Sequence, residues 1–174
     1  MVDYNKIIGK ENSGVIIPGK DYDNIMTYLG YIKEARNFIY LIDRYFNHNS
    51  LDLLRKGLKE NNSIEEIKII SGHDYMDNDF KDMFKKFTKQ MKSDNKIKVE
   101  FRVLINKQDL FLIHDRYLLT KNKSYNFISS DTAARGQLSH ITEVDDMANL
   151  FNELWKRGRD VKRDWSEIEK FLVN

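Results

Sequence analysis

Residues 97–104, IKVEFRVL, predict a β-strand with one apolar and one charged face. Its apolar and charged side chains alternate, Ile97, Val99, Phe101 and Val103 against Lys98, Glu100 and Arg102. Successive side chains on a strand point to opposite faces, so this alternation is typical of a half-buried strand. Two earlier stretches, FIYLI at 38–42 and EIKIISG at 66–72, predict further strands.

Segments with helical spacing separate these strands, whereas the strands expected later in the chain lie close together. Helices are predicted from Asp21 or Asp23 to before Asn37, and over 50–61, 78–92, 146–157 and 160–173. Later strands are predicted at 111–120, 125–130 and 139–144. This order predicts an α/β fold, a mixed β-sheet sandwiched by helices. We expect a single domain over residues 1–174, in which 1–20 form an extended N-terminal arm or edge strands and 145–174 form C-terminal helices.

Composition limits the classes of function. The chain has 174 residues, 41% hydrophobic and 12% aromatic, and contains no cysteine, so neither disulfides nor thiolate metal sites are expected. Its four histidines show no metal-ligand spacing, and we predict no metal and no cofactor. Lys and Arg number 29 against 27 Asp and Glu, which is too even to indicate nucleic acid by itself. Without a signal-peptide pattern or a run of 18 apolar residues, a cytoplasmic location is the expectation.

Residues 112–130, LIHDRYLLTKNKSYNFISS, carry the chemistry. His114 and Arg116 are two apart on a predicted strand and would point to the same face. A hairpin through residues 121–124 would return Ser129 and Ser130 to their side. A nitrogen nucleophile, a fixed cation and hydroxyl groups that converge in this way suit a phosphodiester substrate.

This stretch, together with the order of strands and helices before it, resembles the phospholipase D superfamily, whose signature is His-x-Lys, an Asp five residues past the Lys, and a Gly-Ser-x-Asn strand end. His114 matches the signature histidine; Ser129 matches its serine, or Ser130 if the hairpin holds one extra residue. The chain departs from the signature at Arg116 for Lys, Lys121 for Asp, Ile128 for Gly and Asp131 for Asn. The HDR variant is also similar to the phospholipase D-like C-terminal domain of microtubule-interacting-and-trafficking proteins, which binds membranes without known chemistry.

The resemblance implies a metal-independent phosphodiesterase, a hydrolase that we expect to be a small nuclease. A histidine attacks phosphorus while the histidine of a second motif protonates the leaving oxygen. Since this chain holds one motif, a catalytic form is expected to be a homodimer. His114 would be the nucleophile and Arg116 the phosphate clamp, with Ser129 or Ser130 as hydroxyl donor. Glu143 is the preferred partner of the histidine, with Asp115 and Asp43 as alternatives and His140 as a neighbour.

Further candidates surround this motif. Arg44 ends a predicted strand, where α/β folds gather ligands, and His73 and Asp74 end the next one. Arg135 lies in the small-residue loop 131–137, where it would hold a phosphate, with Asp131 beside it. Nucleic acid, DNA or RNA, is the expected partner. The alternative is a noncatalytic module of the same fold that binds nucleic acid, phospholipid headgroups or a protein partner. The lysines of 85–92 are interpreted as a solvated helix face.

Overall fold

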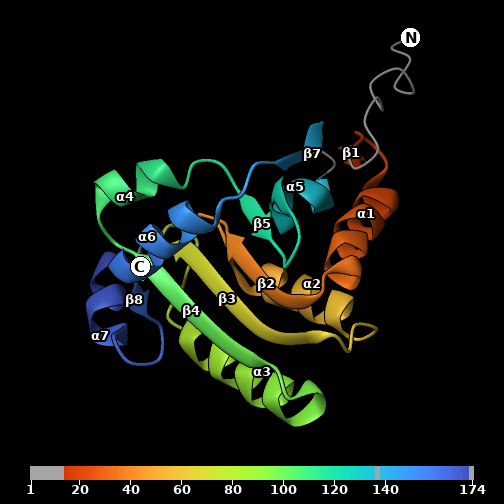
Figure 1. Ribbon diagram of the computed structural model, residues 1–174. Coiled ribbons are helices and arrows are strands. Elements are labelled where there is room, and N and C mark those ends of the chain that lie inside the picture. Colours follow the sequence, from red (N-terminus) through yellow and green to blue (C-terminus); the bar gives the residue numbers. More distant parts are fainter. Residues whose placement is uncertain (1–13, 136–137, 173–174) are drawn as a thin grey trace.

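The computed structural model describes residues 14–135 and 138–172, which form one eight-stranded sheet with helices on both faces (Figure 1). The strands are β1 (Gly14–Ile16), β2 (Asn37–Ile42), β3 (Ile64–Gly72), β4 (Lys98–Leu104), β5 (Tyr117–Leu119), β6 (Ser124–Asn126), β7 (Ser139–Val144) and β8 (Arg159–Asp160). The helices are α1 (Asp21–Glu34), α2 (His48–Leu58), α3 (Phe80–Asn95), α4 (Lys107–Leu112), α5 (Ser130–Arg135), α6 (Ala148–Arg157), α7 (Trp165–Ile168) and the 3₁₀ turn Glu169–Phe171.

The sheet is mixed, in the order β1-β7-β6-β5-β2-β3-β4-β8. Strands β2, β3 and β4 run parallel, and β5 runs antiparallel to β2, with Ile42 opposite Tyr117. The α/β class with a mixed sheet is therefore confirmed. Among the described residues, no helix combines the length and the apolar character needed to cross a membrane.

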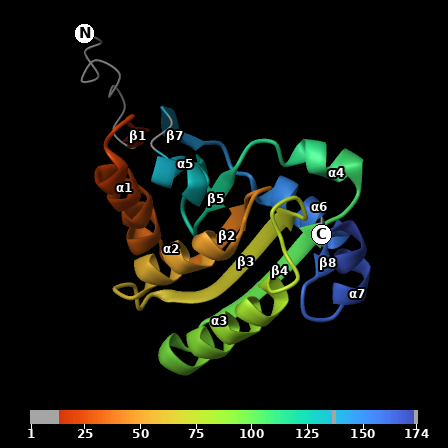
Figure 2. The same cartoon turned by 180° about the vertical axis from the view of Figure 1, so that it is seen from behind.

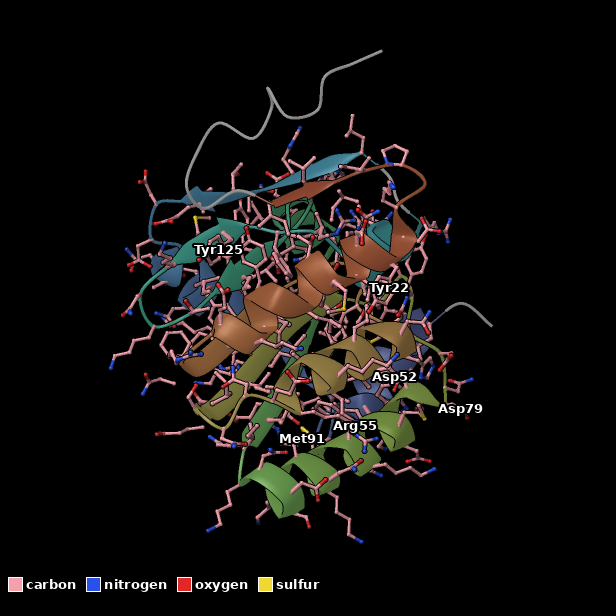
Figure 3. The ribbon with its side chains drawn as sticks, turned by 90° about the vertical axis from the view of Figure 1, so that its right-hand side faces the viewer. Tyr22, Asp52, Arg55, Asp79, Met91 and Tyr125 are labelled. Carbon is pink, nitrogen blue, oxygen red and sulfur yellow. The ribbon has the colours of Figure 1, made fainter. Side chains whose placement is uncertain are left out.

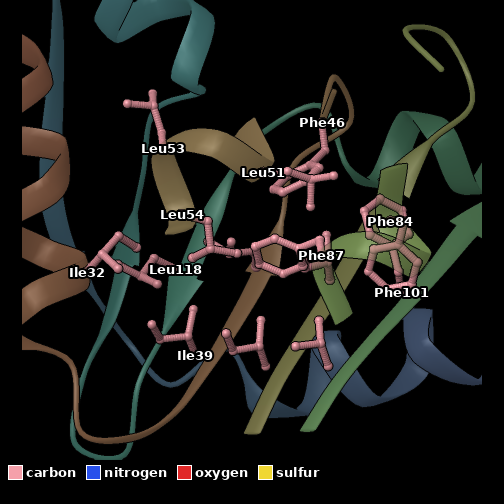
Figure 4. Packing of buried hydrophobic residues seen from close by; sticks show 14 of the residues in the cluster. Ile32, Ile39, Phe46, Leu51, Leu53, Leu54, Phe84, Phe87, Phe101 and Leu118 are labelled. Carbon is pink, nitrogen blue, oxygen red and sulfur yellow. The ribbon is translucent and has the colours of Figure 1, made fainter. Parts of the chain in front are cut away.

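The larger part of the core lies between the sheet and the helices α1, α2 and α3, which Figure 3 shows one below the other. Ile39 of β2 and Phe101 of β4 meet Ile32, Leu54 and Phe84 from those three helices (Figure 4). A smaller cluster on the other face joins the ends of β2, β3 and β4 to α6. Helices α4, α6 and α7 gather at the side of the molecule away from α1 (Figures 1 and 2).

Three predicted elements are wrong in part. The strand expected at 111–120 is a strand only from Tyr117 to Leu119, and its first residues complete α4. Leu110 and Ile113, three residues apart, are buried at 5% and 0% exposure, a helical spacing that prevails over the expected alternation. The strand expected at 125–130 ends at Asn126, and Ser130 begins α5.

The helix expected over 160–173 is interrupted by turns. The Asp160 carboxylate accepts hydrogen bonds from the backbone N–H groups of Lys162 and Arg163, at 2.9 and 3.0 Å. Asp164 in turn accepts one from the N–H of Asp160 at 2.9 Å. Such side-chain bonds compete with helical ones, so regular helix is confined to α7.

Candidate functional site

The carboxyl ends of β2 and β3 meet the amino end of β5 at one edge of the sheet. Asp43 and Arg44 directly follow β2, and His73 and Asp74 follow β3. Because β5 is antiparallel to β2, Arg116, which precedes β5, lies beside Asp43. The topology therefore assembles charged side chains from three distant segments at the edge where parallel sheets bind ligands.

Asp43 anchors Arg116. The Arg116 guanidinium donates from Nε to Asp43 Oδ1 at 3.3 Å, and the backbone N–H of Tyr45 donates to the same oxygen at 3.0 Å. Asp43 is 6% exposed, whereas the Arg116 side chain keeps 25% of its surface in solvent. The carboxylate thus fixes the guanidinium from the protein side, and the terminal amino groups of Arg116 take no part in that bond.

Arg44 is held in a similar way. Its Nε and Nη2 atoms donate to the two carboxylate oxygens of Asp74 at 3.0 and 3.3 Å, a bidentate pair. Burial by itself raises the pKa of Asp74, but the hydrogen bond and the charge of Arg44 outweigh it, so the pKa lies below its ordinary value. The Asp74 carboxylate is therefore ionised at neutral pH.

The Tyr45 ring is close to both arginines. Its centroid is 5.5 Å from Arg44 Cζ and 5.1 Å from Arg116 Cζ, both within the range of cation–π contacts. Tyr75 packs edge-on against the Tyr45 ring, at 5.1 Å between centroids. We call the set Asp43, Arg44, Tyr45, Asp74 and Arg116 the arginine edge.

A hollow of about 340 Å³ adjoins the arginine edge. Its lining residues come from the ends of β2 and β3 and from α4, namely Arg44, His73, Asp74, Lys107, Leu110 and Phe111. Phe111, at the rim of the hollow, is 75% exposed, and Tyr75 nearby is 58% exposed. The edge therefore combines fixed guanidinium groups, a concave surface and aromatic rings that face solvent.

His114 and Arg116 do not lie on the strand that was predicted for them. His114 lies in a bend after α4, where its backbone N–H contacts the Phe111 carbonyl at 3.4 Å. Its side chain is 79% exposed, and the ion pair it forms within the described residues is with its sequence neighbour Asp115, at 4.0 Å from Nδ1. The strand on which the prediction depended begins three residues later, at Tyr117.

The predicted serines are buried and hydrogen-bonded within the protein. Ser129 is 3% exposed, and its Oγ accepts the backbone N–H of Thr132 at 3.0 Å at the start of α5. Ser130 is 2% exposed, and its Oγ lies 2.7 Å from that of Ser50 in α2. Ser50 also forms a capping box with Asn47. These hydroxyl groups join two helix N-termini rather than presenting donors to a ligand.

Glu143 and His140 lie on β7, away from His114. The Glu143 carboxylate pairs with Lys123 Nζ at 2.9 Å beside the β5–β6 hairpin, at the end of β5 opposite to His114. His140 is exposed and stands opposite Val15 of β1. Glu143 is thus not placed to orient His114 in this chain.

The remaining predictions concern α5 and metal binding. Arg135 is exposed at the end of α5. The Asp131 side chain lies outside the described part of the chain. Within the described residues, no group of three or more His, Asp or Glu side chains is arranged to hold a metal ion.

Comparisons with known proteins were made by family model, by sequence and by structure. No family model matches the chain, and no curated protein matches it in sequence. In structure it is similar to TrmBL2, described as an archaeal chromatin protein with a novel mode of DNA binding, at a TM-score of 0.49 and 15% identity. The match covers 92% of this chain and 56% of that one, so the chain spans about half the length of its neighbour. At this degree of similarity the match decides neither family nor function.

Sequence reasoning missed Tyr45, Lys107 and Phe111 as parts of the site. Tyr45 carried a usable signal, because it follows the Asp-Arg pair at a strand end. Lys107 and Phe111 carried no such signal. The sequence predicted a loop and then a strand there, but the structure has the helix α4.

Proposed function

We propose that this protein is a noncatalytic module of phospholipase D-like fold that binds single-stranded nucleic acid at the arginine edge. The observation that carries the proposal is the pair of guanidinium groups that Asp43 and Asp74 fix, both within 5.5 Å of the Tyr45 ring centroid. A guanidinium group carries five N–H donors, so the donors not taken by Asp43, Asp74 and the Leu110 carbonyl are left for phosphate oxygens. Fixing the two groups beforehand reduces the entropy lost on binding.

The aromatic residues favour a nucleic acid over an isolated phosphate. Phe111 and Tyr75 expose most of their rings close to the arginines and the hollow. Unpaired bases stack on such rings, each stacked base contributing roughly 1–3 kcal/mol. Bases in a duplex are already stacked on their neighbours, so a single strand is the better match for this edge.

The state of His114 argues against turnover. A histidine nucleophile requires a partner that fixes its tautomer and direction. With 79% of its side chain exposed and a 4.0 Å contact to Asp115, His114 has little to hold it in place. The buried hydrogen bonds of Ser129 and Ser130 remove the expected hydroxyl donors. The phosphodiesterase hypothesis requires these groups to be rearranged, for example in the homodimer that it predicts.

The test measures binding and cleavage on the same probes. Labelled 20-nucleotide DNA and RNA, single-stranded and duplex, are incubated in EDTA with the wild type, Arg116→Lys, Arg44→Gln and His114→Ala, and native mass is recorded. We expect no cleavage, tighter binding of single strands than of duplexes, weaker binding by both arginine variants, and unchanged binding by His114→Ala.

Two results would overturn the proposal. Cleavage in EDTA that His114→Ala abolishes, with a dimeric mass, would establish the phosphodiesterase instead. Binding to anionic phospholipid vesicles without binding to any oligonucleotide would show that the exposed Phe111 and the arginines serve a membrane surface.

A further inference from the structure

A cationic surface distinct from the arginine edge lies beside the C-terminal half of α3 and the start of β4. It is a groove of about 380 Å³. Five of its eight lining residues are lysines, and no carboxylate is among the described residues that line it: Thr88, Lys89, Lys92, Lys96, Ile97, Lys98, Val99 and Lys162. We call it the lysine groove.

The lysines come from segments that are far apart in the sequence. Lys89 and Lys92 belong to α3, Lys98 begins β4, and Lys162 follows β8. All five lysines are exposed. The sequence shows a lysine-rich helix face, but the addition of Lys162 to that face depends on the pairing of β8 with β4.

Most of these charges have no ion-pair partner in the described part of the chain. Among the ion pairs of residues 14–135 and 138–172, Lys98 is the one groove lysine that takes part, with Glu100 at 2.8 Å and Glu66 at 3.7 Å. Lys162 instead places its Nζ atom 5.5 Å from the centroid of the Phe84 ring. Like charges gathered in a concave surface concentrate anions from solution.

Lys96 has an unusual backbone conformation. It caps the C-terminus of α3 in the left-handed region, with φ of 58°. Glycine or asparagine is favoured at this position, and a lysine is strained there. This conformation ends α3 at the groove that Lys96 lines.

We propose that the lysine groove binds the phosphodiester backbone of nucleic acid without regard to sequence, as a contact separate from the arginine edge. The choice of nucleic acid rests on the proposed function. The absence of arginines and aromatic rings among the described lining residues favours the backbone over the bases, because ammonium groups act as hydrated point charges. The groove lies at the amino end of β4, and the arginine edge lies at the carboxyl ends of the parallel strands β2 and β3.

The test compares two variants of equal charge. The groove variant carries Lys89→Gln, Lys92→Gln, Lys96→Asn and Lys162→Gln. The control variant carries Lys56→Gln, Lys59→Gln, Lys85→Gln and Lys86→Gln, at exposed positions outside the groove. Each loses four positive charges from a net charge of +2. Asparagine tolerates the left-handed region, so the fold is retained at residue 96.

Affinity for labelled 20-nucleotide single strands and duplexes of two unrelated sequences is measured between 50 and 200 mM salt. We expect the groove variant to bind at least about tenfold more weakly at low salt, and its dependence of log affinity on log salt to be shallower by about 3. The control variant should lose less than about twofold, and both sequences should respond equally.

Equal behaviour of the two variants would overturn the proposal, because the lysines would then contribute net charge alone. Unchanged affinity together with self-association of the groove variant would also overturn it. The lysines would then protect the open edge of β4, where β8 pairs with Arg102 and Val103 but not with residues 98–100. Weakening by the groove variant without weakening by Arg44→Gln would uphold this groove and reject the arginine edge.

Discussion

The arginine edge and the lysine groove both present cationic side chains, but two carboxylates balance the two guanidinium groups of the edge, whereas the groove is lined by lysines without a carboxylate among its described residues. Arg116 is fixed by the buried Asp43 and Arg44 by the half-buried Asp74, whereas four of the five groove lysines have no ion pair within the described residues. Fixed charges place donors at defined points and suit recognition of a particular group. Unpaired exposed charges produce a field that attracts a polyanion and is screened by salt. We therefore predict that the charged pairs of the arginine edge contribute to the stability of the fold and that the lysines of the groove do not.

The largest expected effect is on stability. Asp43→Ala leaves the Tyr45 N–H and the Arg116 guanidinium without their buried acceptor, which should lower the free energy of unfolding by about 3 kcal/mol. Urea denaturation of the variant measures this. Asp52→Ala, which removes an exposed carboxylate of α2, is the matched control and should change little.

The groove variant should stay close to the wild type in the same measurement. If the groove variant instead loses as much stability as Asp43→Ala, the lysines also stabilise the fold, and the two regions do not differ in this respect.

The next effect concerns the bases. Phe111→Ala removes an exposed ring from the rim of the hollow and should weaken single-strand binding by about 1–2 kcal/mol, roughly five- to thirtyfold. Duplex binding should be unaffected, because paired bases are not free to stack on the ring. Fluorescence anisotropy with both probes measures the difference. Tyr22→Ala is the control, since Tyr22 is equally exposed, at 74%, but lies on α1 (Figure 3).

Equal weakening of single strands and duplexes by Phe111→Ala would contradict the assignment of base contacts to the arginine edge. It would make the edge another surface for the backbone, like the lysine groove.

A smaller effect follows from the pKa of Asp74, which lies below its ordinary value in the folded protein. A lowered folded-state pKa stabilises the fold above the ordinary carboxyl pKa, and this stabilisation is lost as pH falls through the folded-state pKa. Arg44→Gln removes the main partner of Asp74, so the variant should be less stable at pH 7, by up to about 1 kcal/mol. Free energies of unfolding measured from pH 7 to pH 2 should converge at the acidic end. A difference that persists at pH 2 would assign the effect to packing rather than to the ion pair.

The fold was predicted best for the central strands, whose apolar side chains must be buried in the core. Strands β2, β3 and β4 were expected from their apolar runs, and each is found within three residues of its predicted bounds. The segment 111–116 was misassigned because Leu110 and Ile113 fit a helical spacing within a stretch too short to show its period.

Part of the site follows from strand order. Arg44 and Asp74 were expected to border one end of the sheet because each follows a strand, and they lie there together with Arg116, which precedes β5 instead of lying on a strand with His114. The partner of Arg116, however, is 73 residues away in sequence. It is determined by the register between β2 and β5, which no local pattern reveals.

The smallest expected effect concerns an exposed ion pair, which tests whether a short contact fixes a charge without burial. Lys123 and Glu143 form a contact of 2.9 Å, as short as those of the arginine edge, but their side chains are 34% and 40% exposed. Water screens such a pair, and holding two flexible side chains together offsets the attraction. Glu143→Gln should therefore change neither the urea midpoint nor oligonucleotide affinity beyond experimental error, and a double-mutant cycle with Lys123→Gln should show no coupling. A tenfold loss of affinity would instead return Glu143 to the binding site. A measurable coupling would show that a short ion pair suffices to fix a charge on this protein, and that the burial of Asp43 is not what distinguishes the arginine edge from the lysine groove.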